Sequence, residues 1–182
     1  MTTQTHYFIG ISVPQNEAEM LTAKTEGMKK LFKSWVHPLD YHLTLAFLGH
    51  PDSADQLQAV MKELHTALGE FPSFHLSISG FGTFGRKQAP RIFWAGTEKS
   101  EPLEKVRETV YSVCRKHGFA LDERPFAPHI TIARKWAADE DFQEGMLPGH
   151  PVSAFQVSKI NLFQTKLGEV PKYHTIDTVL LR

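Results

Sequence analysis

The chain has 182 residues, of which 41% are hydrophobic, and its 20 basic and 20 acidic residues give a formal net charge of zero. Without a broad excess of positive charge the chain is poorly suited to duplex nucleic acid, whereas a small or single-ended anionic substrate is compatible with it. No apolar run approaches the roughly 18 residues of a membrane-spanning helix. The N-terminal Met1-Thr2-Thr3-Gln4-Thr5 lacks the features of a secretory signal. We therefore expect a cytoplasmic protein that does not bind membranes.

Apolar periodicity predicts strands that alternate with helices along the chain. In chain order the expected elements are a strand at 6–13, a helix at 16–32, a strand starting at His42, a helix at 57–68, strands at 74–79 and 91–95, a helix from Ser100 to Gly118, and a strand starting at His129. Glycine-rich residues 80–85 predict a hairpin turn, because a phosphate-binding loop would need a helix directly after it. Residues 135–153 predict a surface loop that could act as a lid, and Cys114 predicts a packing role.

The second half of the chain repeats the first. Three pairs of similar residues are separated by nearly the same number of positions: Phe8 and Phe93, His42 and His129, and Phe74 and Phe155. The repeat predicts an α+β fold for residues 1–182, a single bilobal domain of duplicated strand-helix-strand-strand units. We expect two antiparallel-leaning sheets, flanked by helices, with a central cleft between them.

One short motif occurs in both halves, as His42-Leu43-Thr44-Leu45 and as His129-Ile130-Thr131-Ile132. Successive side chains of a strand point to opposite faces, so each copy presents an imidazole and a hydroxyl on one face and two apolar side chains on the other. If the two copies face one cleft, they supply two histidines and two threonines to the same site.

This set of groups is suited to the cleavage of a phosphoester. Histidine exchanges protons near neutral pH, so one imidazole can act as acid and the other as base, while the threonine hydroxyls donate hydrogen bonds to phosphate oxygens. A cyclic phosphodiester fits this scheme most economically, and the scheme requires no cofactor. The histidines and the single cysteine lack metal-ligand spacing, so we expect no metal site.

The chain resembles the two-histidine phosphoesterase superfamily, and within it the bacterial and archaeal RNA 2′,3′-cyclic phosphodiesterases once called 2′-5′ RNA ligases. The stretches that carry the resemblance are Trp35-Val36, His42-Leu43-Thr44-Leu45-Ala46-Phe47-Leu48-Gly49 and Pro128-His129-Ile130-Thr131-Ile132-Ala133-Arg134. The resemblance implies two lobes related by a pseudo-twofold axis and hydrolysis of a terminal 2′,3′-cyclic phosphate to a 2′-phosphomonoester.

By the same resemblance, His42 is the proton donor to the leaving 3′-oxygen and His129 is the proton acceptor that activates water. Thr44, Thr131 and Arg134 are the expected phosphate-binding residues. Strict alternation from His129 places Arg134 on the opposite face of its strand, so this contact requires a twist or bulge.

Two alternatives remain open at the level of the sequence. The substrate could be another small cyclic nucleotide metabolite, or the chain could be a non-catalytic binder of RNA ends. Otherwise the expected partners are RNA 3′ ends or small cyclic nucleotides, bound by a monomer. Several aromatic residues could stack on a base, and the sequence favours none of them individually: Trp35, Tyr41, Phe47, Phe84, Trp94, Phe126 and Trp136.

Overall fold

The computed structural model describes residues 5–182, where the chain forms nine β-strands and three α-helices. In chain order the elements are β1 (Tyr7–Ser12), α1 (Gln15–Thr25), β2 (Phe32–Trp35), β3 (His42–Gly49), α2 (Ala54–Leu68), β4 (Phe74–Gly85), β5 (Pro90–Thr97), α3 (Glu101–Lys116), β6 (His129–Trp136), β7 (Val152–Val157), β8 (Lys159–Thr165) and β9 (Tyr173–Leu180). The predicted α+β class is confirmed. Residues 1–4, which belong to the segment examined for a secretory signal, lie outside the described residues.

The strands pair antiparallel in the order β7-β4-β5-β6-β3-β1-β8-β9, and β2 adds to β6. The two strands that begin with the histidine motifs, β3 and β6, are therefore neighbours in the middle of this order. They join where Leu43 pairs with Ile130. The two expected sheets are thus connected edge to edge through β3 and β6, which brings the two motifs together without a separate domain interface.

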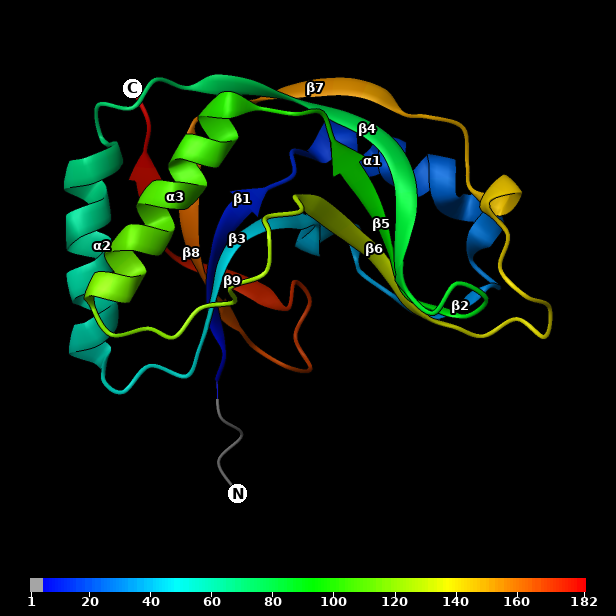
Figure 1. The fold of residues 1–182 in the computed structure, drawn as a ribbon, viewed down its shortest axis with the longest axis horizontal. Coiled ribbons are helices and arrows are strands. Elements are labelled where there is room, and N and C mark those ends of the chain that lie inside the picture. Colours follow the sequence, from blue (N-terminus) through cyan, green and yellow to red (C-terminus); the bar gives the residue numbers. More distant parts are fainter. Residues whose placement is uncertain (1–4) are drawn as a thin grey trace.

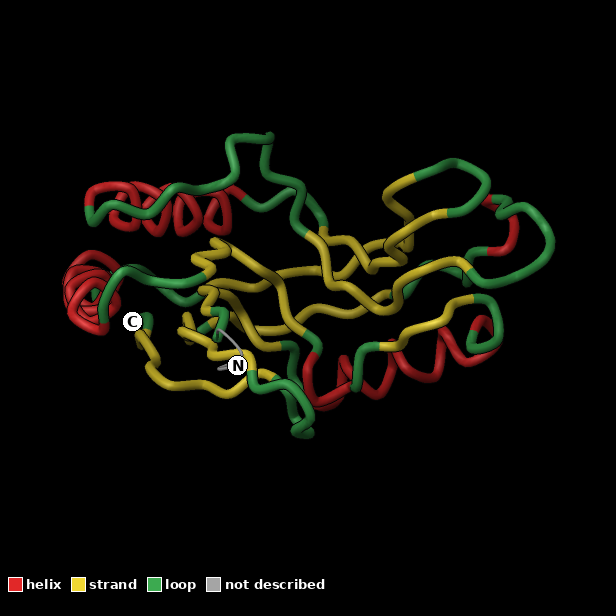
Figure 2. The backbone as a smooth tube through the Cα atoms, turned by 90° about the horizontal axis from the view of Figure 1, so that it is seen from below, coloured by secondary structure: helices red, strands yellow, loops and turns green. Residues whose placement is uncertain are grey.

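The helices cover the sheet at its two ends. Helices α2 and α3 lie side by side at the left of Figure 1, and α1 lies toward the right. The same separation is visible from below in Figure 2, where the strands form the middle of the molecule. In this arrangement α3 contacts β3, α2 contacts β9 and α1 contacts β7. The centre of the sheet, where β3 meets β6, is left free of helices on one face.

Helices α2 and α3 form because their apolar residues recur on one side. The buried residues of α2 are Leu57, Val60, Met61, Leu64 and Leu68, and those of α3 are Leu103, Val106, Val110, Tyr111, Val113 and Cys114. Each fully buried aliphatic side chain contributes about 1.5 to 3 kcal/mol relative to an exposed one. The hydroxyls of Ser53 and Ser100 accept hydrogen bonds from the backbone of Gln56 and Leu103, as expected for N-caps.

The helix expected over residues 16–32 ends earlier than its pattern indicates. Helix α1 stops at Thr25, a short 3₁₀ helix follows, and Phe32 begins strand β2. Phe32 is buried, stacks on Phe93 with ring centroids 5.4 Å apart, and pairs with Trp136 of β6. Packing against β5 and β6 therefore overrides the helical spacing of this residue.

The glycines expected in a hairpin turn lie within β4, which continues to Gly85. The Trp94 ring of β5 lies against Gly82, and a Cβ atom on Gly82 would meet that ring at 2.3 Å. Gly80 has a φ of 65° beside a register shift, as in a β-bulge. The glycines therefore serve close packing inside the strand, and the turn falls at residues 86–89.

The repeat is visible in the order of the strands, although one predicted pair differs. Phe74 and Phe155 lie in β4 and β7, which are direct neighbours, with Leu76 opposite Phe155. Phe8 lies in β1 and Phe93 in β5, so these two strands are counterparts. Because β8 lies beside β1 and β4 lies beside β5, β8 is the counterpart of β4. The local similarity of Phe74 and Phe155 reflects two paired strands with similar buried faces.

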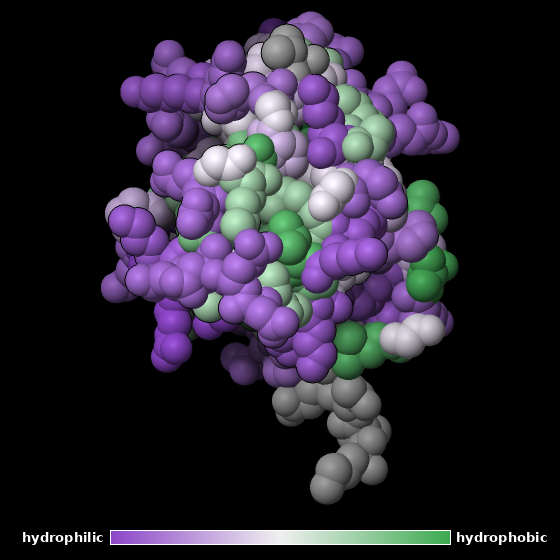
Figure 3. Space-filling model, turned by 90° about the vertical axis from the view of Figure 1, so that its right-hand side faces the viewer, coloured by the Kyte–Doolittle hydropathy of each residue, from purple (hydrophilic) through white to green (hydrophobic). Residues whose placement is uncertain are grey.

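The one face drawn in Figure 3 is mostly polar. Figure 3 shows that the face at the right of Figure 1 carries mainly hydrophilic side chains, with smaller hydrophobic areas between them. Among the helices of residues 5–182, none is long and apolar enough to cross a membrane.

The contact between Gly82 and Trp94 leads to a first prediction. We expect Gly82→Ala to lower the free energy of unfolding by about 1 to 3 kcal/mol, because the new methyl group must displace a large ring in a packed site. Urea denaturation followed by circular dichroism measures this change. Gly149→Ala is the matched control, since a Cβ there has no neighbour within 4 Å. Equal stability of the two variants would contradict the packing role of Gly82.

Candidate active site

The register of β3 against β6 brings the four motif side chains to one face. Because Leu43 and Ile130 are opposite each other in an antiparallel pair, His42 is placed across from Thr131, and Thr44 across from His129. Leu43 and Ile130 are fully buried, whereas the histidines and threonines are partly exposed. Two imidazoles and two hydroxyls thus share the helix-free face where the halves of the sheet meet.

Both histidines are oriented by the same local hydrogen bond. The Nδ1 atom of His42 lies 2.7 Å from the carbonyl oxygen of Asp40, and Nδ1 of His129 lies 2.7 Å from that of Ala127. A carbonyl oxygen can only accept, so in each ring Nδ1 carries the proton and donates. The Nε2 atom of each histidine is left to gain or lose a proton.

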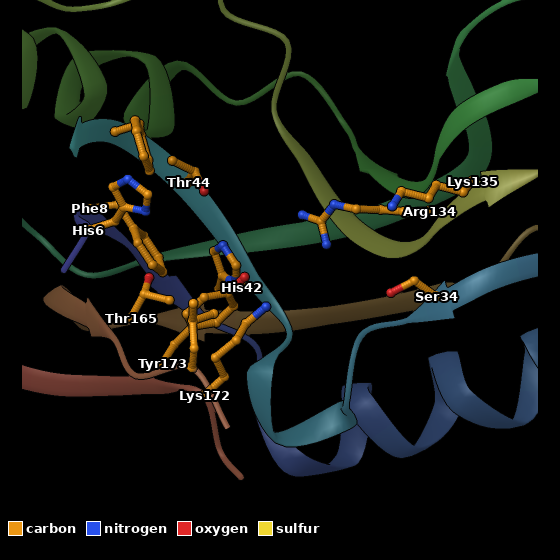
Figure 4. A pocket seen from close by; sticks show the side chains of 12 residues that line it. His6, Phe8, Ser34, His42, Thr44, Arg134, Lys135, Thr165, Lys172 and Tyr173 are labelled. Carbon is orange, nitrogen blue, oxygen red and sulfur yellow. The ribbon is translucent and has the colours of Figure 1, made fainter. Parts of the chain in front are cut away.

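A cavity of about 460 Å³ opens beside β3 and contains part of this site. Its lining residues are His6, Phe8, Ser34, His42, Thr44, Phe47, Arg134, Lys135, Thr165, Leu167, Lys172 and Tyr173. Of the five residues expected from the sequence, His42, Thr44 and Arg134 line the cavity, while His129 and Thr131 lie on the adjoining part of β6. Figure 4 shows the Arg134 guanidinium extending from β6 toward the side of the cavity that holds His42.

A β-bulge in β6 turns Arg134 toward the cavity. Phe93 pairs with Ala133 but Trp94 pairs with Thr131, so Ile132 is an extra residue in the strand. Ile132 and Ala133 are consequently both buried, and the alternation of faces shifts by one residue. Arg134 therefore returns to the face of His129, which resolves the conflict with strict alternation.

Strand β3 has the same irregularity. Ile9 pairs with Ala46 and Gly10 with Thr44, so Leu45 is the extra residue, and Leu45 and Ala46 are both buried. The bulge directs Phe47 to the cavity, at the position that corresponds to Arg134 in the other motif. One half of the site thus ends in a cation and the other in an aromatic ring.

The cavity favours an anionic ligand. Arg134, Lys135 and Lys172 line it, and none of the lining residues named above is acidic. Lys135 has a φ of 65°, a left-handed conformation that costs a non-glycine residue roughly 1 to 2 kcal/mol. This conformation allows two consecutive cations, Arg134 and Lys135, to reach the same cavity.

His42 is neutral in the free protein. Burial lowers the pKa of His42 from its ordinary value of 6.5 to about 4, and electrostatic repulsion by the nearby Arg134 acts in the same direction. The hydrogen bond to the Asp40 carbonyl and the Asp40 charge oppose this shift. A bound phosphate anion beside the ring would raise the pKa again, because an opposite charge favours imidazolium.

Aromatic rings enclose each histidine. The Tyr173 ring meets the His42 ring edge-on at 4.9 Å between centroids, and Phe8 lies at 4.7 Å. Phe84 meets His129 edge-on at 5.0 Å, and Trp94 lies further away at 6.5 Å. Sequence reasoning missed both Phe8 and Tyr173. The apolar strand pattern around Phe8 does not distinguish a core ring from one that borders a site, and Tyr173 begins a mostly polar strand that carries no motif.

The aromatic residues considered for stacking separate into two groups. Phe47 lines the cavity, and Phe84 and Trp94 lie beside His129. The others belong to the packed interior or its margin: Trp35, Tyr41, Phe126 and Trp136. Trp35, for example, packs on Phe93 and receives Lys29 over its ring.

Within residues 5–182, no three His, Cys, Asp or Glu side chains lie where they could together hold a metal ion. Cys114 is buried in α3, and burial raises the pKa of its thiol to about 12. The thiol therefore stays protonated and is not a nucleophile near neutral pH.

Comparison with known proteins identifies the family. A family model described as the 2′-5′ RNA ligase superfamily matches residues 14–169. A Bacillus subtilis protein named RNA 2′,3′-cyclic phosphodiesterase is 36% identical over 182 residues, which covers 94% of this chain and 93% of that protein. A Geobacillus stearothermophilus protein of the same name is 39% identical over 178 residues, 95% of this chain but 56% of that longer protein. The chain belongs to the 2′-5′ RNA ligase superfamily.

Solved structures share the fold. A Thermus thermophilus protein matches with a TM-score of 0.82 at 22% identity, covering 97% of this chain and 98% of the other. Escherichia coli LigT complexed with 3′-AMP matches with a TM-score of 0.77 at 24% identity, covering 98% and 99%.

The low pKa of His42 predicts an acid-sensitive contribution to stability. The unfolded chain binds a proton near pH 6.5, but the folded protein does not do so until about pH 4. The contribution of the neutral His42 side chain to the free energy of unfolding is therefore complete above pH 6.5 and is lost as the pH falls to about 4. We expect His42→Asn to reduce the loss of unfolding free energy over this range, measured by urea denaturation at each pH. The exposed His75→Asn is the control, and equal pH dependence in both variants would contradict the shift.

Proposed function

We propose that this chain hydrolyses the 2′,3′-cyclic phosphate ends of RNA or nucleotides to 2′-phosphomonoesters, using two histidines and no metal ion. The observation that carries this proposal is the pairing of Leu43 with Ile130, which sets two similarly oriented imidazoles and two threonines on one face. The relatives named RNA 2′,3′-cyclic phosphodiesterase support the same activity.

In the proposed reaction, Nε2 of His129 accepts a proton from water as the water oxygen bonds to phosphorus. The bond between phosphorus and the 3′-oxygen breaks, and that oxygen takes the proton from Nε2 of His42. Thr44, Thr131 and Arg134 hold the non-bridging oxygens of the phosphate. The cyclic phosphate anion itself raises the pKa of His42, so that the donor is protonated when substrate is bound.

We also propose that residues 1–182 act as one bilobal domain, with pseudo-twofold related halves, as a cytoplasmic monomer. The sheet order supports two equivalent halves. From the centre outward, one half continues as β3, β1 and β8, and the other continues as β6, β5 and β4.

The first test of the function is substitution of each histidine. We expect His42→Ala and His129→Ala to lower kcat on a 2′,3′-cyclic nucleotide by about 10² to 10⁴, because each removes one proton-transfer group. Phosphorus NMR of the product measures turnover and distinguishes 2′- from 3′-phosphate. EDTA should leave the wild-type rate unchanged, and His75→Ala, at an exposed position on β4, is the control. Full activity of either site variant would refute the assignment.

The division into donor and acceptor predicts a selective rescue. A substrate with sulfur in place of the bridging 3′-oxygen has a leaving group that needs no proton. We expect this substrate to restore most of the rate of His42→Ala and little of the rate of His129→Ala. If the sulfur substrate rescues His129→Ala alone, the assignment is wrong, and His129 is the proton donor and His42 the acceptor.

The cavity volume of about 460 Å³ also suits a single small nucleotide. Rates on a cyclic mononucleotide, on a cyclic phosphate of ADP-ribose and on an oligoribonucleotide separate the two substrate classes. A strong preference for the oligonucleotide would exclude a small metabolite as the main substrate. Multiple turnover on any of them would exclude a non-catalytic binder of RNA ends.

A further inference from the structure

One buried acidic residue outside the motifs contacts both the proposed donor and a second segment that lines the cavity, at Lys172 and Tyr173. Asp40 is 6% exposed and ends the short 3₁₀ helix Pro38–Asp40 before β3. Its Oδ2 atom accepts a hydrogen bond of 3.1 Å from the backbone of Lys172, and Oδ1 accepts one of 3.0 Å from Tyr173. Its carbonyl oxygen accepts from Nδ1 of His42.

These contacts hold His42 from two directions. The carbonyl of Asp40 fixes the rotation and the tautomer of the ring. The carboxyl group of Asp40 fastens the first residue of β9, Tyr173, whose ring stands edge-on against His42. Figure 4 shows His42, Lys172 and Tyr173 gathered at this side of the cavity. A side chain buried beside the site therefore joins two distant segments around one imidazole.

The second motif has no such arrangement. His129 is oriented by the carbonyl of Ala127, whose methyl side chain cannot accept a hydrogen bond. The rings beside His129, Phe84 and Trp94, belong to the β4–β5 hairpin, whose two strands are paired along most of their length. Tyr173 is the last residue of the β8–β9 pairing, opposite Thr165, at the point where the loop of residues 166–172 meets β9. The carboxyl group of Asp40 ties this end of the hairpin to the start of β3.

We propose that Asp40 is a positioning residue of the reaction, which holds the His42 imidazole in its Nδ1-protonated form by tying the start of β9 to the start of β3. This proposal deepens the function proposed above and rests on it for its kinetic part. Asp40 does not touch the substrate. It keeps Nε2 of His42 directed at the leaving oxygen and keeps Lys172 at the rim of the cavity.

The test compares Asp40→Asn and Asp40→Ala with Asp177→Asn and Asp177→Ala. Asp177, on β9, is a matched control, because its carboxyl group also accepts a backbone N–H, but from Thr178, and its other partner is His65. We expect kcat on a cyclic mononucleotide to fall about 10- to 100-fold in Asp40→Ala and less in Asp40→Asn, with KM changing less than kcat. Asparagine retains one acceptor and should rescue part of the rate.

A second readout needs no substrate. Nitrogen-15 NMR of the imidazoles measures the share of each ring that carries its proton on Nδ1. We expect this share to fall for His42 in the Asp40 variants and to stay constant for His129, which serves as the internal control in the same spectrum. The Asp177 variants should change neither ring. If Asp40→Ala does not fold, Asp40→Asn provides both readouts.

The outcomes separate the two proposals. A wild-type protein that does not hydrolyse cyclic phosphates, but whose His42 tautomer responds to Asp40, would refute the function and retain the coupling. A constant His42 tautomer in Asp40→Asn and Asp40→Ala, or an equal change at His129, would overturn the positioning role. Unchanged kcat in Asp40→Ala would overturn it as well.

Discussion

The pairing of Leu43 with Ile130 is the contact on which the site depends. It joins β3 to β6 at the middle of the sheet order and sets the relative position of the two halves of the chain. Both side chains are fully buried, so a slip of one residue would expose them and would bury the histidines. The same hydrophobic constraint that stabilises the sheet thus fixes the distance and orientation of two imidazoles.

The two bulges extend this site beyond the motif itself. Each places two buried residues in succession after the threonine, at Leu45 and Ala46 in β3 and at Ile132 and Ala133 in β6. The next side chain then returns to the active face, where it is Phe47 in one half and Arg134 in the other. The halves share a backbone geometry but differ in chemistry, with a cation beside one motif and an aromatic ring beside the other.

Much of this could be read from the sequence, for identifiable reasons. The strands that carry His42 and His129 alternate apolar and polar residues, and α2 has a clear apolar face with a serine cap, so local patterns predicted these elements correctly. Where packing competed with local pattern, prediction failed. Phe32 lies in a strand because it stacks on Phe93, and the glycines of β4 lie under Trp94 instead of forming a turn.

The sequence by itself determined the family, the α+β class and the two motifs that the proposed reaction uses, because these follow from residue identity and local periodicity. The tertiary structure decided which further residues reach the site. Arg134 faces the cavity only because Ile132 is an extra residue in its strand, and Asp40 and Tyr173 meet at His42 although they are far apart in the chain. Such contacts depend on register and on long-range packing, which no local pattern of residues encodes.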